Sequence, residues 1–288
     1  MTPYPFRRLL VVNARPEPDT GLLQYAAALQ SREPEAQVVV ASMAGESVMR
    51  YLATISRSIL RQHDSAISFR VLLEPHLDLI FDLATEARCD LIVARQPSDS
   101  SDGRLVVRQL LFDAPCAVCL VPDGARASLR RPLVRLEPTT RGSRLLGIAS
   151  ALARHSRSDE LLALHTYFHA GLDAEKQTLR QLRMEREIEL YRFLARADLS
   201  GVNCTPLLEE SPSQSRSLLR IAAERQADLL AFDPATDEMP VWQWNRRHSE
   251  ALARATPLPV LSVCLSTASR IISSLREHVF TEMEVPFN

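Results

Sequence analysis

Residues 90–121 read DLIVARQPSDSSDGRLVVRQLLFDAPCAVCLV, and residues 228–263 repeat the same order of features as DLLAFDPATDEMPVWQWNRRHSEALARATPLPVLSV. Each stretch has an aspartate, a short apolar run, a polar loop, a helical segment, a proline after a small residue and a second apolar run. The preceding segments also match, as FDLATEARCDLIV from Phe81 and LRIAAERQADLLA from Leu219. A strand–loop–helix–strand unit that recurs once in a chain of this length predicts a duplicated domain.

The composition is that of an ordinary soluble globular protein, with 46% hydrophobic and 24% charged residues and a formal net charge of −1. Its 288 residues allow two domains of typical size. The balanced charge creates no field that would select nucleic acid or acidic lipid. No apolar stretch approaches the length of a membrane span, and no signal peptide is expected after Met1. Five scattered cysteines predict reduced thiols in the cytoplasm.

Short apolar runs alternate with helical patterns along both halves, which predicts a βαβαβαβαβ order in each. Short, continuously apolar strands separated by helices are typical of a parallel sheet covered by helices on both faces. The predicted domains span 1–124 and 131–266, and a tail at 267–288 has no counterpart in the first copy. In the second half, the long helix at 172–199 is expected to bury a stripe made of Leu179, Leu182, Ile188, Tyr191 and Leu194.

The repeated unit resembles the universal stress protein family in its tandem two-domain form. The marks are an apolar first strand that ends in a polar residue, a fourth strand that begins DLI or DLL, and APC-x-V or TPLPV at the fifth strand. The resemblance implies two adenine-nucleotide-alpha-hydrolase-like (Rossmann-like) domains, each a five-stranded parallel sheet with helices on both faces. It also implies that the domains pair through their fifth strands, here within one chain, with a homodimer as a further possibility.

Many members of this family bind ATP through a G-x2-G-x9-G-S/T loop after the fourth strand. Glycines there let backbone N–H groups approach the phosphates at a helix N-terminus. In the second half, Asp233, Thr236 and Arg246 stand at the glycine positions and Arg247 at the Ser/Thr position. A carboxylate beside a triphosphate costs roughly 1–4 kcal/mol, depending on screening. In the first half, Gly103 is the single glycine and the loop is too short, so both loops are degenerate.

The positions around the expected cleft are candidate ligand- or nucleotide-binding residues, and none is expected to be catalytic or to bind a metal. They are Asn13, Ala14, Met43, Glu137, Thr139, Asp233, Thr236, Arg246 and Arg247. Asn13 replaces the acid that ends the first strand in nucleotide-binding members, and Glu137 is a longer substitute in the second copy. Arg246 and Arg247 could bind an anion through their side chains, which differs from a backbone cradle.

Other clusters have both a functional and a purely structural interpretation. They are Cys116 with Cys119, His165 with His169, Trp242 with Trp244, and the polar run Ser98–Asp102. The cysteines have redox spacing, but residues three apart on a strand point to opposite faces. The histidines have metal spacing only on a helix, and they end an expected strand. The tryptophans could stack on a ligand or fill a domain contact, and the polar run is either a phosphate or cation site or a solvated turn.

These observations lead to two hypotheses from different classes. The first is a non-catalytic stress-response protein that binds a partner or a small ligand and has no cofactor. The second is an ATP-binding switch, with weak hydrolysis at most, that uses the second domain. The same cleft could also take another metabolite or an anionic lipid, which the sequence does not separate from the first hypothesis.

Overall fold

The computed structural model describes residues 6–15, 17, 19–30, 36–42, 54–55, 58–59, 66–71, 76–97, 100–167, 176–234 and 246–263. They form two compact units that meet in the sequence between Ser128 and Leu129. This boundary lies between the ends predicted for the two domains, at 124 and 131. The predicted tail at 267–288 lies outside the described residues.

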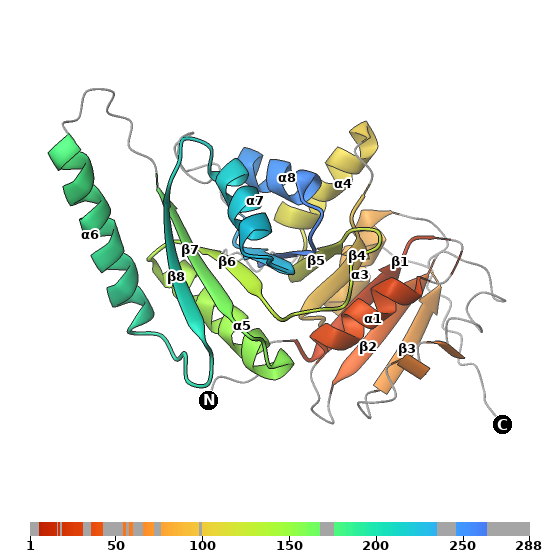
Figure 1. Cartoon of the computed structure of the whole chain (residues 1–288). Coiled ribbons are helices and arrows are strands. Elements are labelled where there is room, and N and C mark those ends of the chain that lie inside the picture. The colour runs from red at the N-terminus through yellow and green to blue at the C-terminus, as the bar shows by residue number, and fades with distance from the viewer. Residues whose placement is uncertain are drawn as a thin grey trace. The chain divides into compact units, whose positions relative to one another are not determined.

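The first unit is built on a five-stranded parallel sheet with the strand order β3-β2-β1-β4-β5. Its strands are β1 (Arg8–Asn13), β2 (Gln37–Ser42), β3 (Ala66–Val71), β4 (Leu91–Arg95) and β5 (Ala117–Val121). Its helices are α1 (Thr20–Leu29), α3 (Leu77–Glu86) and α4 (Ser101–Phe112). Parallel strands require crossover connections, and in the described residues α1 lies between β1 and β2, α3 between β3 and β4, and α4 between β4 and β5 (Figure 1).

The second unit repeats this plan with the strand order β10-β9-β6-β7-β8. Its strands are β6 (Pro132–Leu136), β7 (Leu161–Tyr167), β8 (Cys204–Glu210), β9 (Leu229–Phe232) and β10 (Val260–Ser262). Its helices are α5 (Thr140–Ser156), α6 (Lys176–Leu194), α7 (Gln214–Glu224) and α8 (Arg246–Ala255). Figure 1 shows α7 and α8 together on one side of this sheet and α5 on the other. The predicted parallel α/β architecture of each half is confirmed.

The central strands are buried along their length, which explains their continuously apolar sequences. On β1, Leu9, Leu10 and Val11 have no exposed surface, and the same holds for Leu133 and Val134 on β6. A strand covered by helices on both faces has no solvent side, so apolar residues do not alternate with polar ones. The hydrophobic core of each unit therefore lies on both sides of its own sheet.

The duplication extends to single hydrogen bonds. The carboxylate of Asp90, just before β4, accepts the backbone N–H groups of Arg7 and Arg8, both at 3.0 Å. Asp228, just before β9, accepts those of Arg130 and Arg131 at 2.6 and 3.0 Å. The aspartate that begins each copy of the repeat thus ties the start of the first strand of its unit to the fourth.

One prediction about α6 is wrong. Leu190 and Leu194 are buried, as a core-facing stripe requires, but Ile188 and Tyr191 are exposed. Each residue advances an α-helix by about 100°, so Ile188 lies about 200° around the axis from Leu190. The helix buries a narrow stripe against β8, and its apolar outer residues face solvent.

Among the described residues, no helix is long and apolar enough to cross a membrane.

Candidate functional site

The strand order of each sheet reverses between its first and fourth strands, β1 and β4 in one unit and β6 and β9 in the other. In open parallel sheets, ligands bind in the crevice outside the carboxyl ends of the strands at such a reversal. The residues that follow these four strands are therefore the place to look for a site. We call the residues beyond these strand ends the crevice of each unit, and a bidentate ion pair lies there in both units.

In the first unit, Arg95 ends β4 and pairs through Nε and Nη2 with the carboxylate of Asp19. Its Nη1 donates to the carbonyl of Pro122 at 2.8 Å. Asp19 also caps α1 by accepting the N–H of Leu22 at 2.9 Å. The side chains of Asp19 and Arg95 are 7% and 15% exposed, so this ion pair is largely withdrawn from solvent.

A second, exposed ion pair extends the first. Arg15 donates to both oxygens of Asp123 at 2.7 Å, and Asp123 also lies 3.7 Å from Nε of Arg95. We call Arg15, Asp19, Arg95 and Asp123 the first-half cluster. Its two guanidinium groups balance its two carboxylates, so the cluster has no net charge to attract a polyphosphate.

Asn13 holds the loop that carries this cluster. Its amide nitrogen donates to the carbonyl of Arg15 at 2.9 Å and to Oγ of Ser42 at 3.3 Å, while its oxygen accepts the N–H of Asp19 at 3.2 Å. Asn13 is buried. The amide at the end of β1 therefore supports the position of Asp19.

In the second unit, Arg141 donates through Nε and Nη2 to the two oxygens of Asp233, at 2.6 and 2.7 Å. Arg141 lies in the first turn of α5, and Asp233 directly follows β9. Their side chains are 38% and 16% exposed. Asp233, which was predicted to stand at the first glycine position of the loop, thus has a guanidinium partner.

Arg135 places a further charge beneath this pair. Arg135 is buried on β6 and pairs with Glu137, and its Nη2 lies 3.4 Å from Oε1 of Gln214. Burial lowers the pKa of the Arg135 guanidinium, and Glu137 opposes that shift. Arg135, Glu137, Arg141 and Asp233 form the second-half cluster, which again has two groups of each sign.

The start of α5 is fixed closely against the end of β6. Oγ1 of Thr139 accepts the N–H of Gly142 at 3.2 Å and caps the helix. A Cβ at Gly142 would lie 1.8 Å from the carbonyl oxygen of Glu137, so only glycine allows this approach. This packing sets the position of Arg141, one residue earlier, at the crevice.

The histidine and cysteine candidates have structural roles where they are described. His165 is buried with Nδ1 3.1 Å from the carbonyl oxygen of Leu136, and burial lowers its pKa. Burial raises the pKa of the Cys116 and Cys119 thiols far above the usual range, which disfavours the reactive thiolate. Within the part of the chain that the structure describes, no three His, Cys, Asp or Glu side chains could hold a metal ion. His169, Trp242 and Trp244 lie outside that part.

The remaining candidates fall into three groups. Asp233, Glu137 and Asn13 lie at strand ends in the crevices, with the contacts given above, and Ala14 follows Asn13 at an exposed position. Arg246 and Arg247 open α8. Met43 and Thr236 lie outside the described residues, as do Ser98 and Asp99, whereas Ser100 caps α4 by accepting the N–H of Gly103 at 3.0 Å.

Several charged residues of the two clusters were not among the candidates predicted from the sequence. Asp19, Arg95, Arg135 and Arg141 complete the clusters. The available signal was weak: an arginine inside or at the end of an otherwise apolar strand, as in LIVAR and PLVRL, indicates a charge that needs a partner.

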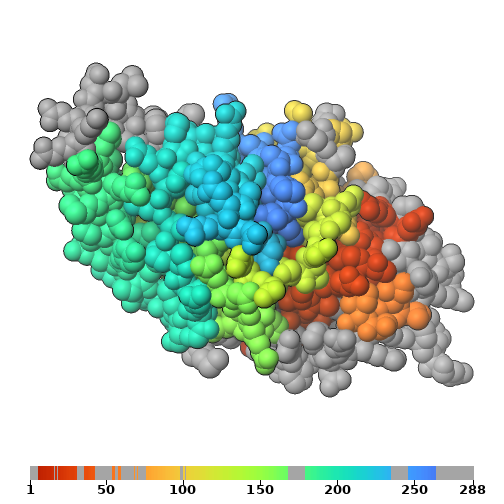
Figure 2. All heavy atoms as spheres, viewed as in Figure 1, coloured from red at the N-terminus to blue at the C-terminus, as the bar shows by residue number. Residues whose placement is uncertain are grey.

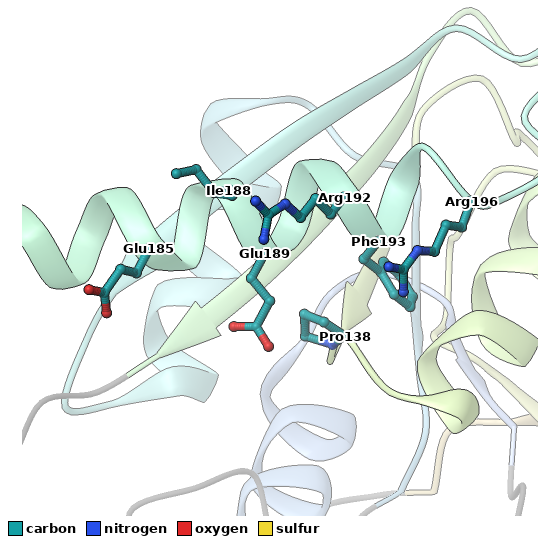
Figure 3. Close-up of a pocket in the computed structure, with 7 residues that line it drawn as sticks. All are labelled: Pro138, Glu185, Ile188, Glu189, Arg192, Phe193 and Arg196. Carbon is teal, nitrogen blue, oxygen red and sulfur yellow. The ribbon is translucent and has the colours of Figure 1, made fainter.

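A separate cavity of about 460 Å³ lies beside α6 in the second unit (Figure 3). Its lining residues are Pro138, Glu185, Ile188, Glu189, Arg192, Phe193 and Arg196. All of them except Pro138 come from α6 and the turn that follows it. Pro138 follows Glu137, so the loop between β6 and α5 touches both the crevice and this cavity.

No family model matches the sequence, and no curated protein matches it. Solved structures do match. A protein of unknown function from Pseudomonas aeruginosa PAO1 superposes with a TM-score of 0.69 at 14% identity, over 90% of this chain and 92% of its own. A universal stress protein from Archaeoglobus fulgidus superposes with a TM-score of 0.58 at 14% identity, over 91% and 97%. This chain has the tandem universal stress protein fold.

The same fold also occurs outside stress proteins. The cytoplasmic domain of a prokaryotic cation chloride cotransporter superposes on this chain with a TM-score of 0.53 at 13% identity, over 90% of this chain and 95% of its own. At such identities the likeness concerns the fold alone. What this tandem universal stress protein fold does here depends on its own crevices.

Proposed function

We propose that this chain is a non-catalytic, universal-stress-protein-like stress-response protein that acts by binding a protein partner or a small ligand. In this proposal neither crevice takes ATP in the manner of the nucleotide-binding members. The observation that carries it is the bidentate ion pair at the strand-order reversal of each unit, Asp19 with Arg95 and Arg141 with Asp233.

Each ion pair opposes a bound polyphosphate in two ways. Its carboxylate repels the phosphates, and its guanidinium would have to leave that carboxylate before it could bind them. Leaving a buried charge without its partner costs about 3–5 kcal/mol, and a partly exposed pair such as Arg141 with Asp233 costs less. The Cβ at Asp233 also keeps the main chain away from a ligand where glycine would let it approach.

Calorimetric titration of the full chain with Mg-ATP tests the proposal. We expect no nucleotide to be released when the purified protein is denatured, and binding no tighter than millimolar. Submicromolar affinity for Mg-ATP in the unmodified protein would contradict the proposal.

The variant Asp233→Gly sharpens this test, because it removes the repelling carboxylate, restores the glycine and releases Arg141. If the rest of the pocket is suitable, we expect the affinity for Mg-ATP to rise by about tenfold or more, since each 1.4 kcal/mol is a factor of ten. The matched control is Asp159→Gly, which changes an exposed carboxylate in the same unit that pairs with Arg130. The control should leave Mg-ATP binding unchanged.

One observation favours the second candidate function, an ATP-binding switch in the second unit. Arg141 is more exposed than Arg95 and lies at the N-terminus of α5, where the helix dipole favours anions. If this switch exists, Mg-ATP binding by the unmodified protein should weaken in the variant Arg141→Ala. Loss of binding in Arg95→Ala instead would place the nucleotide in the first unit.

A further inference from the structure

A row of large apolar side chains lies on the outer surface of α6. Met184, Ile188 and Tyr191 are 57%, 43% and 53% exposed. Among the described residues, Leu105 is the other large hydrophobic side chain with comparable exposure. Figure 2 shows the atoms of α6, in green, at the surface of its unit. Apolar residues of this size are normally buried in a partner when they gather on one helix face.

The spacing of the row is that of a helix-pairing seam. Met184, Ile188 and Tyr191 are separated by four and three residues, and the same steps lead to Gln181 and Ala195, which are both exposed. Steps of three and four repeat the a and d positions of a heptad, which face a second helix in a coiled coil. We call these five positions the α6 seam.

The charges beside the seam attract those of a second α6 when the two helices run antiparallel. Glu185 follows Met184 and Arg192 follows Tyr191, so both lie on the same flank and are separated by two helical turns. If a second α6 runs antiparallel, Glu185 faces Arg192 of the partner subunit, and the two-fold axis produces this pair twice. The same register places Ile188 against the partner's Tyr191 and Met184 against the partner's Ala195.

We propose that the α6 seam binds a second copy of this chain, with the two α6 helices antiparallel about a two-fold axis. The occupant is another copy because the row of apolar side chains and its flanking charges complement themselves. This surface is distinct from the fifth strands, through which the resemblance predicts that the domains pair. The proposal depends on the geometry of α6 and does not depend on what the crevices bind.

The expected dimer is weak. One helix pair of a few turns buries less than the roughly 1,200–2,000 Å² of a standard stable interface. Interfaces below that range are typical of transient association. We therefore expect a dissociation constant in the micromolar range or weaker. Glu185, Ile188 and Arg192 line the cavity beside α6 and also belong to the α6 seam or its charged flank (Figure 3). A second copy bound to the seam would therefore contact residues that line this cavity.

Sedimentation velocity of the full chain over a range of concentrations tests the proposal. Glu185→Arg and Arg192→Glu should each weaken the dimer by about tenfold or more, because each places like charges opposite each other twice. The double variant should restore the dimer. A mixture of the two single variants should also form a dimer, because both interhelical pairs are then attractive.

Two controls accompany these variants. Leu105→Asp replaces an exposed leucine on α4 and should leave the dimer unchanged. Thermal unfolding followed by circular dichroism should be the same for all variants, because the altered positions are exposed. A protein that stays monomeric at all concentrations, a dimer that ignores the charge reversals, or a loss that neither the double variant nor the mixture restores would each overturn the proposal.

Discussion

The ion pairs in the two crevices have opposite polarity. In the first unit the carboxylate of Asp19 follows β1 and the guanidinium of Arg95 ends β4. In the second unit the guanidinium of Arg141 follows β6 and the carboxylate of Asp233 follows β9. The shared feature is therefore an ion pair between the first and fourth strands, whichever strand supplies the acid.

The ion pair of Asp19 predicts a pH-dependent stability. Burial by itself would raise the pKa of Asp19, but hydrogen bonds from Arg95 and from the N–H of Leu22 outweigh it and hold that pKa below its usual value. A carboxylate with a lowered pKa stabilises the fold above its unfolded pKa of about 3.9, and this contribution is lost as the pH falls through the lowered value. In urea unfolding, Asp19→Asn should lose about 2–4 kcal/mol at pH 7 and show a smaller further loss in acid.

The matched control for Asp19 lies in the same cluster. Asp123→Asn removes a carboxylate from an exposed pair with Arg15, which should cost at most about 1 kcal/mol. Equal losses for Asp19→Asn and Asp123→Asn would contradict the view that burial makes the pair of Asp19 with Arg95 the more stabilising of the two.

At the scale of the element, α5 contains two glycines with opposite predicted effects. In Gly142→Ala the new Cβ would lie 1.8 Å from the backbone carbonyl of Glu137, so the start of the helix must shift. We expect a loss of about 1–3 kcal/mol in the free energy of unfolding, measured by urea denaturation. The shift of the helix start should also displace Arg141 from Asp233. A change in Mg-ATP binding in this variant would then indicate that the position of Arg141 affects the nucleotide.

Gly147→Ala is the internal control in the same helix. A Cβ at Gly147 would have no atom within 4 Å, and alanine favours the helix over glycine by about 0.5–1 kcal/mol. This variant should therefore be slightly more stable than the unmodified protein. Similar losses of stability in Gly142→Ala and Gly147→Ala would contradict this explanation, because only Gly142 lies close to the carbonyl of Glu137.

At the scale of the whole molecule, the repeat predicts equivalent roles for Asp90 and Asp228. Each carboxylate accepts two backbone N–H groups at or just before the start of the first strand of its own unit. Hydrogen bonds to a charged group contribute about 1.5–3 kcal/mol, so Asp90→Ala and Asp228→Ala should each cost about 2–4 kcal/mol.

The two losses should add in the double variant, because the carboxylates accept from different backbone N–H groups and lie in separate units. Chemical denaturation of the full chain measures all three variants. A loss in the double variant that differs from the sum by more than about 0.5 kcal/mol would indicate energetic coupling between the units.

Much of the fold could be predicted from local sequence. Strands such as LLVVN and LLALH are almost entirely apolar because helices cover them on both faces. Such a run can be recognised without knowing which strands are its neighbours. The cap of α5 at Thr139 is equally local, because its partner is three residues away. The misassigned face of α6 shows the limit: Ile188 and Tyr191 are apolar, yet composition alone does not say which apolar stripe meets the sheet.

Local sequence patterns were sufficient to recognise one α/β module present twice, and they predict that neither loop after the fourth strand matches the glycine motif of the nucleotide-binding members. Which charges pair beyond the strand ends became visible only in the folded chain. Arg95 and Asp19 are separated by 76 residues, and Arg141 and Asp233 by 92. The physical reason is that the first and fourth strands become neighbours only when the parallel sheet forms, so no local pattern encodes the partners at their carboxyl ends.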